Sequence, residues 1–239
     1  MSTSRSPRTV WITGASSGIG RALALAFVHA GDVVIATSRS LRPLKHLQHE
    51  LGAKGEVYAC DVRNERAVER VARKVLQRHS KVDILVNNAG VTSFAEFAGT
   101  SVKEFDEILD TNLRGLFLTT RAVLPSMIRK RDGLILNILS YAAKTTYTKS
   151  AAYSAAKAGA EAMMNVLRAE VRGKGIRVMN IYPGAILTPM WPSRLRKRHA
   201  ASMMSADDVA RLVVQLTEQP KTLHIEELVV RPPQGDLRV

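Results

Sequence analysis

The chain has 239 residues, of which 46% are apolar, and a formal net charge of +14 at pH 7. This length suits one large domain or two small ones, and no apolar run approaches the ~18 residues expected of a membrane span. The opening residues MSTSRSPR contain no apolar segment, so we expect no secretory signal. The single cysteine, Cys60, excludes an internal disulfide, suits a reducing cytoplasm and is expected to pack in the core rather than to carry redox chemistry.

The first half of the chain alternates between strand-like and helix-like segments. A strand is expected at residues 8–13, followed by a glycine-rich turn and by a helix at residues 21–31 that ends at Gly31. Further strands are expected at residues 32–38, 55–62 and 81–90, and helices at residues 44–51, just after Pro43, and 65–79.

The second half continues the same alternation. We expect a long helix over residues 103–131, a strand at 133–140, a helix that contains Tyr153 and runs to about Arg172, a strand at 175–184, an Asp-capped helix at 206–216 and a last strand at 225–232. No repeat or linker interrupts this order. It predicts a single α/β domain over residues 1–239, a Rossmann-type doubly wound parallel sheet with helices on both faces.

The run TGASSGIG, from Thr13 to Gly20, lies directly between the first strand and the first helix. Its glycines, Gly14, Gly18 and Gly20, would let the backbone approach a pyrophosphate, and the helix N-terminus would present free N–H groups to the phosphates. A glycine-rich turn by itself is also compatible with a simple tight connection. The strand-turn-helix context favours a dinucleotide cofactor.

The end of the second strand decides which nicotinamide cofactor is expected. NAD enzymes place an acidic residue there to bind the ribose 2′-hydroxyl, whereas this chain has Ser38 and Arg39. Arg39 could pair with a 2′-phosphate, so the sequence favours NADP. The alternative is a solvated arginine, and Ser17 supplies no second basic residue in the glycine turn.

Three side chains suggest proton transfer. Tyr153 and Lys157 are four residues apart in a helical segment, so they share one face of the helix. A cation there, together with an oxidised nicotinamide ring, would lower the pKa of the phenol from about 10 and make Tyr153 a usable acid and base. Ser140 follows a buried apolar strand, so its hydroxyl should lie at the carboxyl end, where open α/β sheets bind ligands.

These motifs, with Asp61–Val62, NNAG at residues 87–90, Asn112 and PGAILT at residues 183–188, resemble the classical short-chain dehydrogenases/reductases in the same order over nearly the whole chain. The resemblance implies that Ser140 hydrogen-bonds the substrate, Tyr153 transfers the proton, Lys157 binds the nicotinamide ribose and tunes Tyr153, and Asn112 supports a water-linked proton relay through its main chain. The cofactor contacts that the turn and the resemblance imply are Gly14, Ser16, Ser17, Gly18, Ile19, Gly20, Ser38, Arg39, Asp61, Val62, Asn88, Ala89, Gly90, Tyr153, Lys157, Pro183, Gly184, Ile186 and Thr188.

The main hypothesis is an NADP-dependent oxidoreductase that interconverts an alcohol and a ketone or aldehyde. We expect no metal, because the six histidines are dispersed along the chain. A catalytically silent cofactor-binding regulator stays open as a second class, although a complete Ser-Tyr-Lys set counts against it. A nucleic-acid binder rests on charge alone, and we expect no specific nucleic-acid or membrane partner.

The C-terminal part bears on substrate and assembly. Reductases of 3-oxoacyl carrier proteins are an alternative, but this C-terminus is more similar to the branch of hydroxy-acid dehydrogenases and carbonyl reductases. In the family, residues 187–206 would form a lid, in which Trp191, Leu195 and the methionines could supply an apolar wall. Arg194, Arg196, Lys197 and Arg198 form either an anion clamp or an exposed basic face. The resemblance also implies a homodimer or homotetramer, formed through the long helix and the Tyr153 helix.

Overall fold

The computed structural model describes residues 5–237. Residues 1–4 and 238–239 of the predicted domain lie outside the described residues. Seven strands form one sheet in the order β3-β2-β1-β4-β5-β6-β7, and every neighbouring pair is parallel. The order reverses between β1 and β4, which places a ligand crevice at the carboxyl ends of these strands. The strands are β1 Thr9–Thr13, β2 Val33–Ser38, β3 Gly55–Ala59, β4 Ile84–Asn87, β5 Gly133–Ile138, β6 Ile176–Pro183 and β7 Glu227–Val230.

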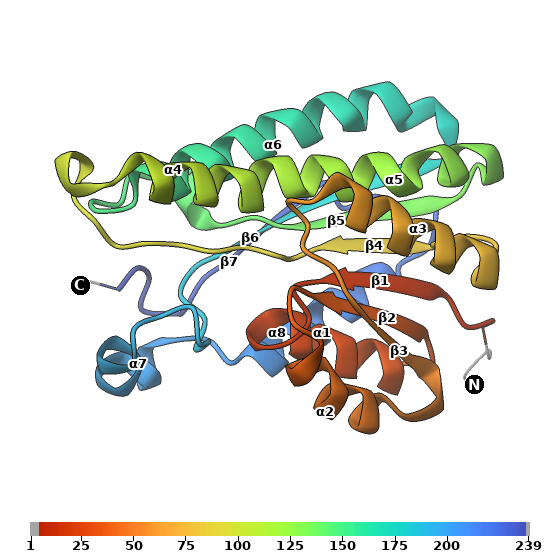
Figure 1. Cartoon of the computed structure of the whole chain (residues 1–239), viewed down its shortest axis with the longest axis horizontal. Coiled ribbons are helices and arrows are strands. Elements are labelled where there is room, and N and C mark those ends of the chain that lie inside the picture. Colours follow the sequence, from red (N-terminus) through yellow and green to blue (C-terminus); the bar gives the residue numbers. More distant parts are fainter. Residues whose placement is uncertain (1–4, 238–239) are drawn as a thin grey trace.

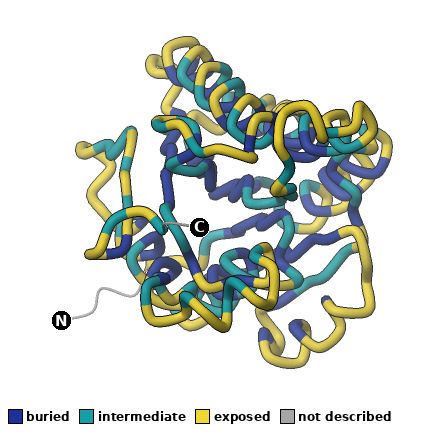
Figure 2. The backbone as a smooth tube through the Cα atoms, turned by 90° about the vertical axis from the view of Figure 1, so that its left-hand side faces the viewer, coloured by how far each residue is buried: buried dark blue, intermediate teal, exposed yellow. Residues whose placement is uncertain are grey.

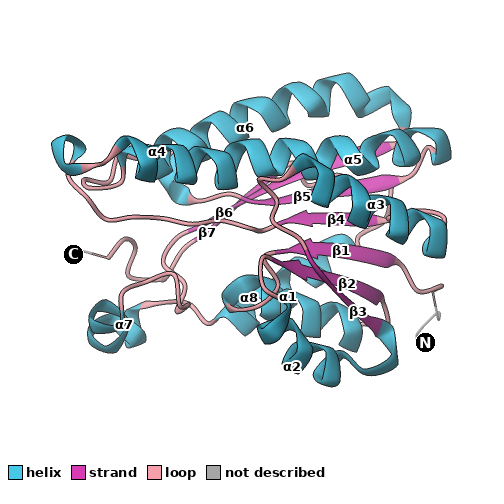
Figure 3. Ribbon diagram, in the orientation of Figure 1, coloured by secondary structure: helices cyan, strands magenta, loops and turns pink. Residues whose placement is uncertain are grey.

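Helices cover both faces of the sheet, which confirms the predicted doubly wound α/β fold. Figure 3 shows α3 to α6 on one face and α1, α2 and α8 on the other, while α7 lies beside the C-terminal tail. The helices are α1 Gly18–His29, α2 Leu41–Leu51, α3 Glu65–His79, α4 Val102–Leu109, α5 Gly115–Lys130, α6 Ala151–Val171, α7 Ser193–His199 and α8 Ala206–Thr217. Within residues 5–237, no helix combines the length and apolar character needed to cross a bilayer.

The central strands β1, β4 and β5 are buried along their whole length because both faces of the sheet are covered. All five residues of β1 are buried, and they divide between two cores: Val10 and Ile12 pack toward α1 and α8, and Trp11 packs toward α3 and α5. Figure 2 shows the buried backbone running through the middle of the molecule, with exposed segments around it. Cys60 belongs to the second core, as predicted, and burial raises the pKa of its thiol to about 11.

A row of buried asparagines crosses the sheet near the carboxyl ends of three strands. Asn87, Asn137 and Asn180 are in register, and each neighbouring pair is joined by an amide hydrogen bond of 2.9 Å. A one-residue slip of any strand would leave buried amides without partners, at a cost of about 1–3 kcal/mol each. The row therefore fixes the register at the edge where the ligand crevice opens.

The long helix predicted over residues 103–131 is present, but it is not uniformly α-helical. Residues Asp110–Arg114 form a π-helical turn between α4 and α5 (Figure 1). A π turn accommodates one extra residue, which hydrophobic periodicity does not reveal. It carries Asn112, one of the predicted catalytic residues.

The predicted aspartate cap of α8 is wrong. Ser205 caps this helix, and its hydroxyl oxygen accepts hydrogen bonds from the backbone N–H groups of Asp207 and Asp208. The two aspartates lie in the first turn, where their charge favours the helix N-terminus. The cap is therefore the serine two residues before the acidic pair, a residue type that N-cap positions prefer.

The N-terminal segment is joined to the sheet by charged contacts around Asp32. This fully buried carboxylate accepts hydrogen bonds from the Arg8 backbone N–H at 3.0 Å and from the Arg8 and Arg5 guanidinium groups at 2.7 and 3.0 Å. Burial acts to raise the pKa of Asp32, but the hydrogen bonds from Arg5 and Arg8 outweigh it and lower the pKa below its usual range.

Candidate active site

The glycine turn fits closely against the loop after β4. Gly14 has a φ of +66°, and a Cβ added to it would lie 2.8 Å from the Ala89 Cα atom. A Cβ on Gly20 would lie 2.4 Å from the Asn88 side-chain amide. Only glycine fits at these two positions, so the turn and the NNAG segment form one unit.

Hydrogen bonds hold the same two segments together. The Thr13 hydroxyl accepts the backbone N–H groups of Asn88 and Ala89, both at 3.0 Å. The Asn88 amide in turn donates to the carbonyls of Thr13 and Gly14 at 2.9 and 3.2 Å. Thr13 was missing from the predicted site residues, although it is the first residue of the TGASSGIG run.

Most of the predicted cofactor residues line one groove along the carboxyl ends of β1, β2 and β4. From the prediction it contains Gly14, Ser16, Ser17, Gly18, Ile19, Ser38, Arg39, Asp61, Val62, Asn88, Ala89, Gly90 and Thr188. Gly20 packs beneath the turn instead. Positive φ angles, glycines that cannot carry a side chain and the N-terminus of α1 together suit an extended ligand with phosphate groups. The residues present therefore fit a dinucleotide.

Charged side chains surround the end of this groove nearest β2 and β3. Arg39 is half exposed, and its Nη1 lies 3.5 Å from the Glu107 Oε1 atom of α4. Arg63 forms a 2.7 Å ion pair with Asp61, and its Nη1 lies 3.6 Å from the same Glu107 oxygen. Hydrogen bonds from Arg63 lower the pKa of Asp61. Sequence reasoning missed Arg63 and Glu107, whose proximity to Arg39 depends on the fold.

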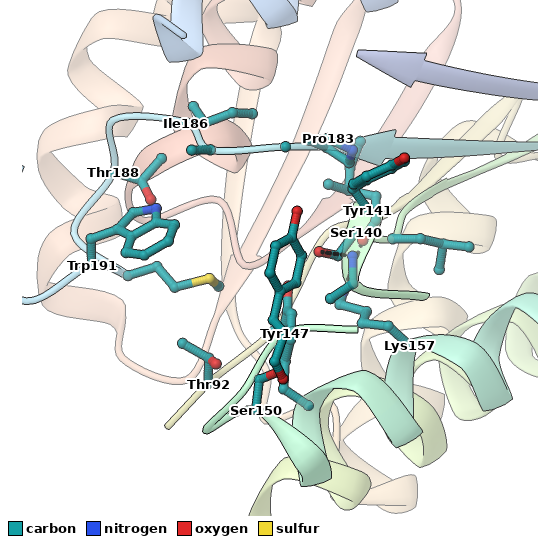
Figure 4. A pocket seen from close by; sticks show the side chains of 18 of the residues that line it. Thr92, Ser140, Tyr141, Tyr147, Ser150, Lys157, Pro183, Ile186, Thr188 and Trp191 are labelled. Atoms are coloured by element: carbon teal, nitrogen blue, oxygen red, sulfur yellow. Dashed lines mark hydrogen bonds between the residues drawn. The ribbon is translucent and has the colours of Figure 1, made fainter. Parts of the chain in front are cut away.

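The predicted catalytic side chains meet in a second cavity that adjoins the groove. Ser140, Tyr153 and Lys157 all line it, with Pro183 at the end of β6 and Gly184 and Ile186 just after it. Figure 4 shows Ser140, Lys157, Pro183 and Ile186 among the lining side chains. Ile19, Asn88, Gly90, Thr92, Thr188 and Met190 line both hollows. The proton-transfer residues and the phosphate-binding turn therefore belong to one continuous site.

Each catalytic candidate is held by its local structure. Ser140 lies two residues beyond β5, and its Oγ accepts the Ala142 N–H at 3.1 Å. Tyr153 lies in the first turn of α6, and Lys157 follows one turn later. The Lys157 Nζ atom donates to the Ile138 carbonyl at 2.9 Å and lies 5.6 Å from the centre of the Tyr153 ring.

Burial governs the pKa values of this pair. It raises the pKa of Tyr153, while a hydrogen bond with Ser140 acts in the opposite direction. It also lowers the pKa of Lys157 to about 8. Desolvation disfavours the charged forms of both side chains in the protein alone. The lowering of the Tyr153 pKa by the lysine together with an oxidised nicotinamide stays a prediction.

Asn112 lies beside the site without lining either hollow. Its side-chain amide donates to the carbonyls of Val91 and Ile108 at 2.8 and 2.9 Å, so it ties the π turn to the loop after β4. A Cβ on Gly90 would lie 2.7 Å from its Oδ1 atom, which is buried and has no hydrogen-bond partner among residues 5–237. The relay through its main chain stays a prediction.

The lid segment contributes apolar surface but none of its four cations. Trp191 and Met190 line the cavity, and Figure 4 shows Trp191 and Thr188 across it from Ser140 and Tyr141. The Trp191 ring stacks on Phe94 with 5.3 Å between centroids. The predicted apolar wall is correct for Trp191, whereas Leu195, Met203 and Met204 are not among the lining residues described.

Of the two alternatives for the four lid cations, the structure favours the exposed basic face over the anion clamp. Arg194, Lys197 and Arg198 are exposed, and the Arg196 Nε donates to the Trp191 carbonyl at 3.1 Å. None of these side chains belongs to the described cavity lining. The seven-residue helix α7 carries them toward solvent.

The C-terminal tail forms a wall that sequence reasoning missed. Asp236 and Leu237 line the cavity, and the Tyr147 hydroxyl donates to Asp236 Oδ1 at 2.5 Å. Arg231 pairs with Asp236 at 2.8 Å and stacks on the Tyr141 ring at 4.2 Å. Burial and Asp236 raise the pKa of Tyr147. Tyr147 and Asp236 are 89 positions apart in the chain, and Tyr141 and Arg231 are 90 apart, so only the fold brings them together.

Comparisons with known proteins agree with this geometry. The family model described as short chain dehydrogenase matches residues 8–199. A sepiapterin reductase from Chlorobaculum tepidum is 34% identical, over 95% of this chain and 97% of its own, and a serine 3-dehydrogenase from Agrobacterium fabrum is 34% identical over 94% and 93%. The closed form of a serine dehydrogenase complexed with NADP+ superposes with a TM-score of 0.90 at 31% identity, covering 97% of each chain. Motifs, topology and relatives lead to one conclusion: the chain belongs to the short-chain dehydrogenase family.

Proposed function

We propose that this protein is an NADP(H)-dependent oxidoreductase that interconverts an alcohol and a ketone or aldehyde of a small molecule. The observation that carries the proposal is the continuity of the two hollows. Ser140, Tyr153 and Lys157 line the cavity that opens from the glycine-turn groove. A ligand that fills the groove would therefore end beside the hydroxyl groups that could bind a carbonyl oxygen.

The roles of the three side chains follow from their chemistry. When bound, the nicotinamide supplies or accepts a hydride. The Ser140 hydroxyl donates a hydrogen bond to the substrate oxygen, and Tyr153 gives its phenolic proton to that oxygen during reduction or removes it during oxidation. Lys157, held against the Ile138 carbonyl, favours the tyrosinate whenever it is protonated.

Arg39 is the residue we assign to the 2′-phosphate of NADP(H). It lines the groove at the end of β2, where this chain has no carboxylate to bind a ribose 2′-hydroxyl. A guanidinium binds phosphate through charge-assisted hydrogen bonds. The NADP+-bound relative supports the same cofactor. Titration of NADPH and NADH against wild type and Arg39→Asp tests this: we expect wild type to prefer NADPH and the variant to lose that preference. Equal wild-type affinities would refute the assignment.

Substitution of Tyr153 by phenylalanine tests the proton donor. The change keeps the ring but removes the hydroxyl, so we expect NADPH to bind as before while turnover falls by ~10²–10⁴ or more. Fluorescence titration of NADPH measures the first quantity, and the initial rate with an active substrate measures the second. Normal turnover by the variant would remove Tyr153 from the proton-transfer step.

Two other functions make different predictions for the wild type. A reductase of 3-oxoacyl carrier proteins would prefer an acyl thioester of an acidic carrier over free ketones. A silent NADP-binding regulator would bind the cofactor but turn over no member of a broad panel. A screen of 3-hydroxy acids, sugars, steroids and acyl thioesters separates all three.

We propose a homodimer or homotetramer as the assembly. Large apolar side chains are exposed along α4, α5 and α6, the helices expected to meet between subunits: Val102, Phe105, Phe117 and Val166. Just before α4, Phe97 is 85% exposed. Exposed large apolar side chains on these helices suit a subunit interface.

Residues 187–206 are proposed as the lid over the substrate. The aromatic stack of Trp191 on Phe94 joins this segment to the loop after β4, across the mouth of the cavity. Its movement would admit the substrate and exclude water.

A further inference from the structure

A single carboxylate bridges two arginines at the adenosine end of the groove. Glu107 Oε1 lies 3.5 Å from the Arg39 Nη1 and 3.6 Å from the Arg63 Nη1. These arginines come from separate connections, Arg39 after β2 and Arg63 after β3, while Glu107 lies on α4. An acidic group therefore reaches the guanidinium that we assign to the 2′-phosphate.

Arg63 has a second acidic partner, whereas Arg39 has none among the described residues. Arg63 is held by Asp61, with hydrogen bonds of 3.1 and 2.7 Å to the carboxylate, so it has a firm contact without Glu107. Arg39 is 56% exposed, and Glu107 is its ion-pair partner in the described structure. Because water screens exposed ion pairs and they contribute little, an incoming phosphate can displace Glu107 from Arg39 at small cost.

We propose that Glu107 is a specificity-determining residue that competes with the 2′-phosphate of NADP(H) for Arg39 and so weakens cofactor binding selectively. The proposal rests on the assignment of Arg39 to that phosphate. A phosphate that engages Arg39 carries up to two negative charges beside the Glu107 carboxylate, and like charges a few ångströms apart repel. NADH has no 2′-phosphate, so its affinity is set without this repulsion.

Substitution of Glu107 by glutamine keeps the side-chain size and removes the charge. We expect the variant to bind NADPH and 2′,5′-ADP about 3- to 10-fold more tightly at low salt, and NADH within about twofold of wild type. The gain should shrink as salt is raised, because both groups are solvent-exposed. Fluorescence or calorimetric titration gives each Kd directly and does not depend on turnover.

Glu104→Gln is the matched control. Glu104 lies on the same helix, one turn before Glu107, and the substitution changes the net charge by the same amount. Equal tightening in both variants would show a general charge effect and overturn the proposal. Unchanged or weaker NADPH binding by Glu107→Gln would also overturn it, the latter result making Glu107 a residue that positions Arg39.

Arg39→Ala separates failure of this proposal from failure of its premise. If Arg39→Ala loses the NADPH preference while Glu107→Gln changes nothing, Glu107 alone is wrongly assigned. If Arg39→Ala keeps the preference, the phosphate assignment fails, and the role of Glu107 fails with it. In the double variant, the gain from Glu107→Gln should disappear, because no guanidinium remains to compete for.

Discussion

Replacing Lys157 by methionine should stabilise the protein while abolishing its proposed activity. The ammonium is 4% exposed, and burial lowers its pKa from 10.5 to about 8. At neutral pH this shift corresponds to a folding cost of about 3 kcal/mol, since each tenfold change in proton affinity is worth about 1.4 kcal/mol. The variant also loses the hydrogen bond to the Ile138 carbonyl, which destabilises it by about 1.5 kcal/mol and offsets part of this gain. We therefore expect the cofactor-free variant to be about 1–2 kcal/mol more stable near pH 7.

The pH dependence of the stability difference between variant and wild type gives a cleaner test than its absolute value. Between about pH 8 and 10.5 the unfolded wild type binds more protons at Lys157 than the folded protein, so its stability at this site rises with pH. The methionine variant lacks that rise, and its advantage should shrink by about 2 kcal/mol between about pH 7 and pH 9.5.

Urea denaturation without cofactor at both pH values measures this difference. The exposed Lys174, replaced by methionine in the same way, serves as the control for a change of net charge. A stability difference that does not vary with pH would refute the reasoning, as would a variant clearly less stable than wild type near pH 7.

Further predictions concern folding and assembly. Asp32→Asn should cost about 1.5–3 kcal/mol, because the charge-assisted hydrogen bonds from Arg5 and Arg8 are weakened while these arginines stay partly exposed to water. Since the folded pKa of Asp32 lies below its ordinary value, the contribution is present above about pH 4 and is lost as the pH falls through the lowered value, which urea titrations from about pH 3 to 6 would detect. In light scattering at micromolar concentration, wild type should have the mass of a dimer or tetramer and Phe105→Glu a smaller mass, and a monomeric wild type would contradict the proposed assembly.

The fold was predictable because its signals are local. Central strands such as β1 carry runs of large apolar residues, and the glycine turn marks the junction of strand and helix. The spacing of Tyr153 and Lys157 on α6 was equally readable, since four residues make about one helical turn.

What sequence reasoning missed depends on tertiary contacts. The Tyr147–Asp236 hydrogen bond and the Arg39–Glu107 pair join residues 89 and 68 positions apart, so no motif connects them. The two alternatives for the basic lid residues stayed open for the same reason, because composition does not say which face of a short helix meets the cavity. The raised Tyr153 pKa reflects burial, which spacing alone could not supply.

The π turn at Asp110–Arg114 joins α4 to α5 without a break and changes the direction in which the side chains of α5 point relative to those of α4. The first part, α4, packs against α6, while α5 packs against α3 and the sheet. An additional residue between them rotates the second part by about 100° relative to an unbroken α-helix. Deleting one residue within the turn would therefore leave the hydrogen-bonded ladder intact but turn either α4 or α5 away from its partners. Insertions and deletions should be tolerated in the surface loops yet forbidden here, at a place where the chain looks like uninterrupted helix.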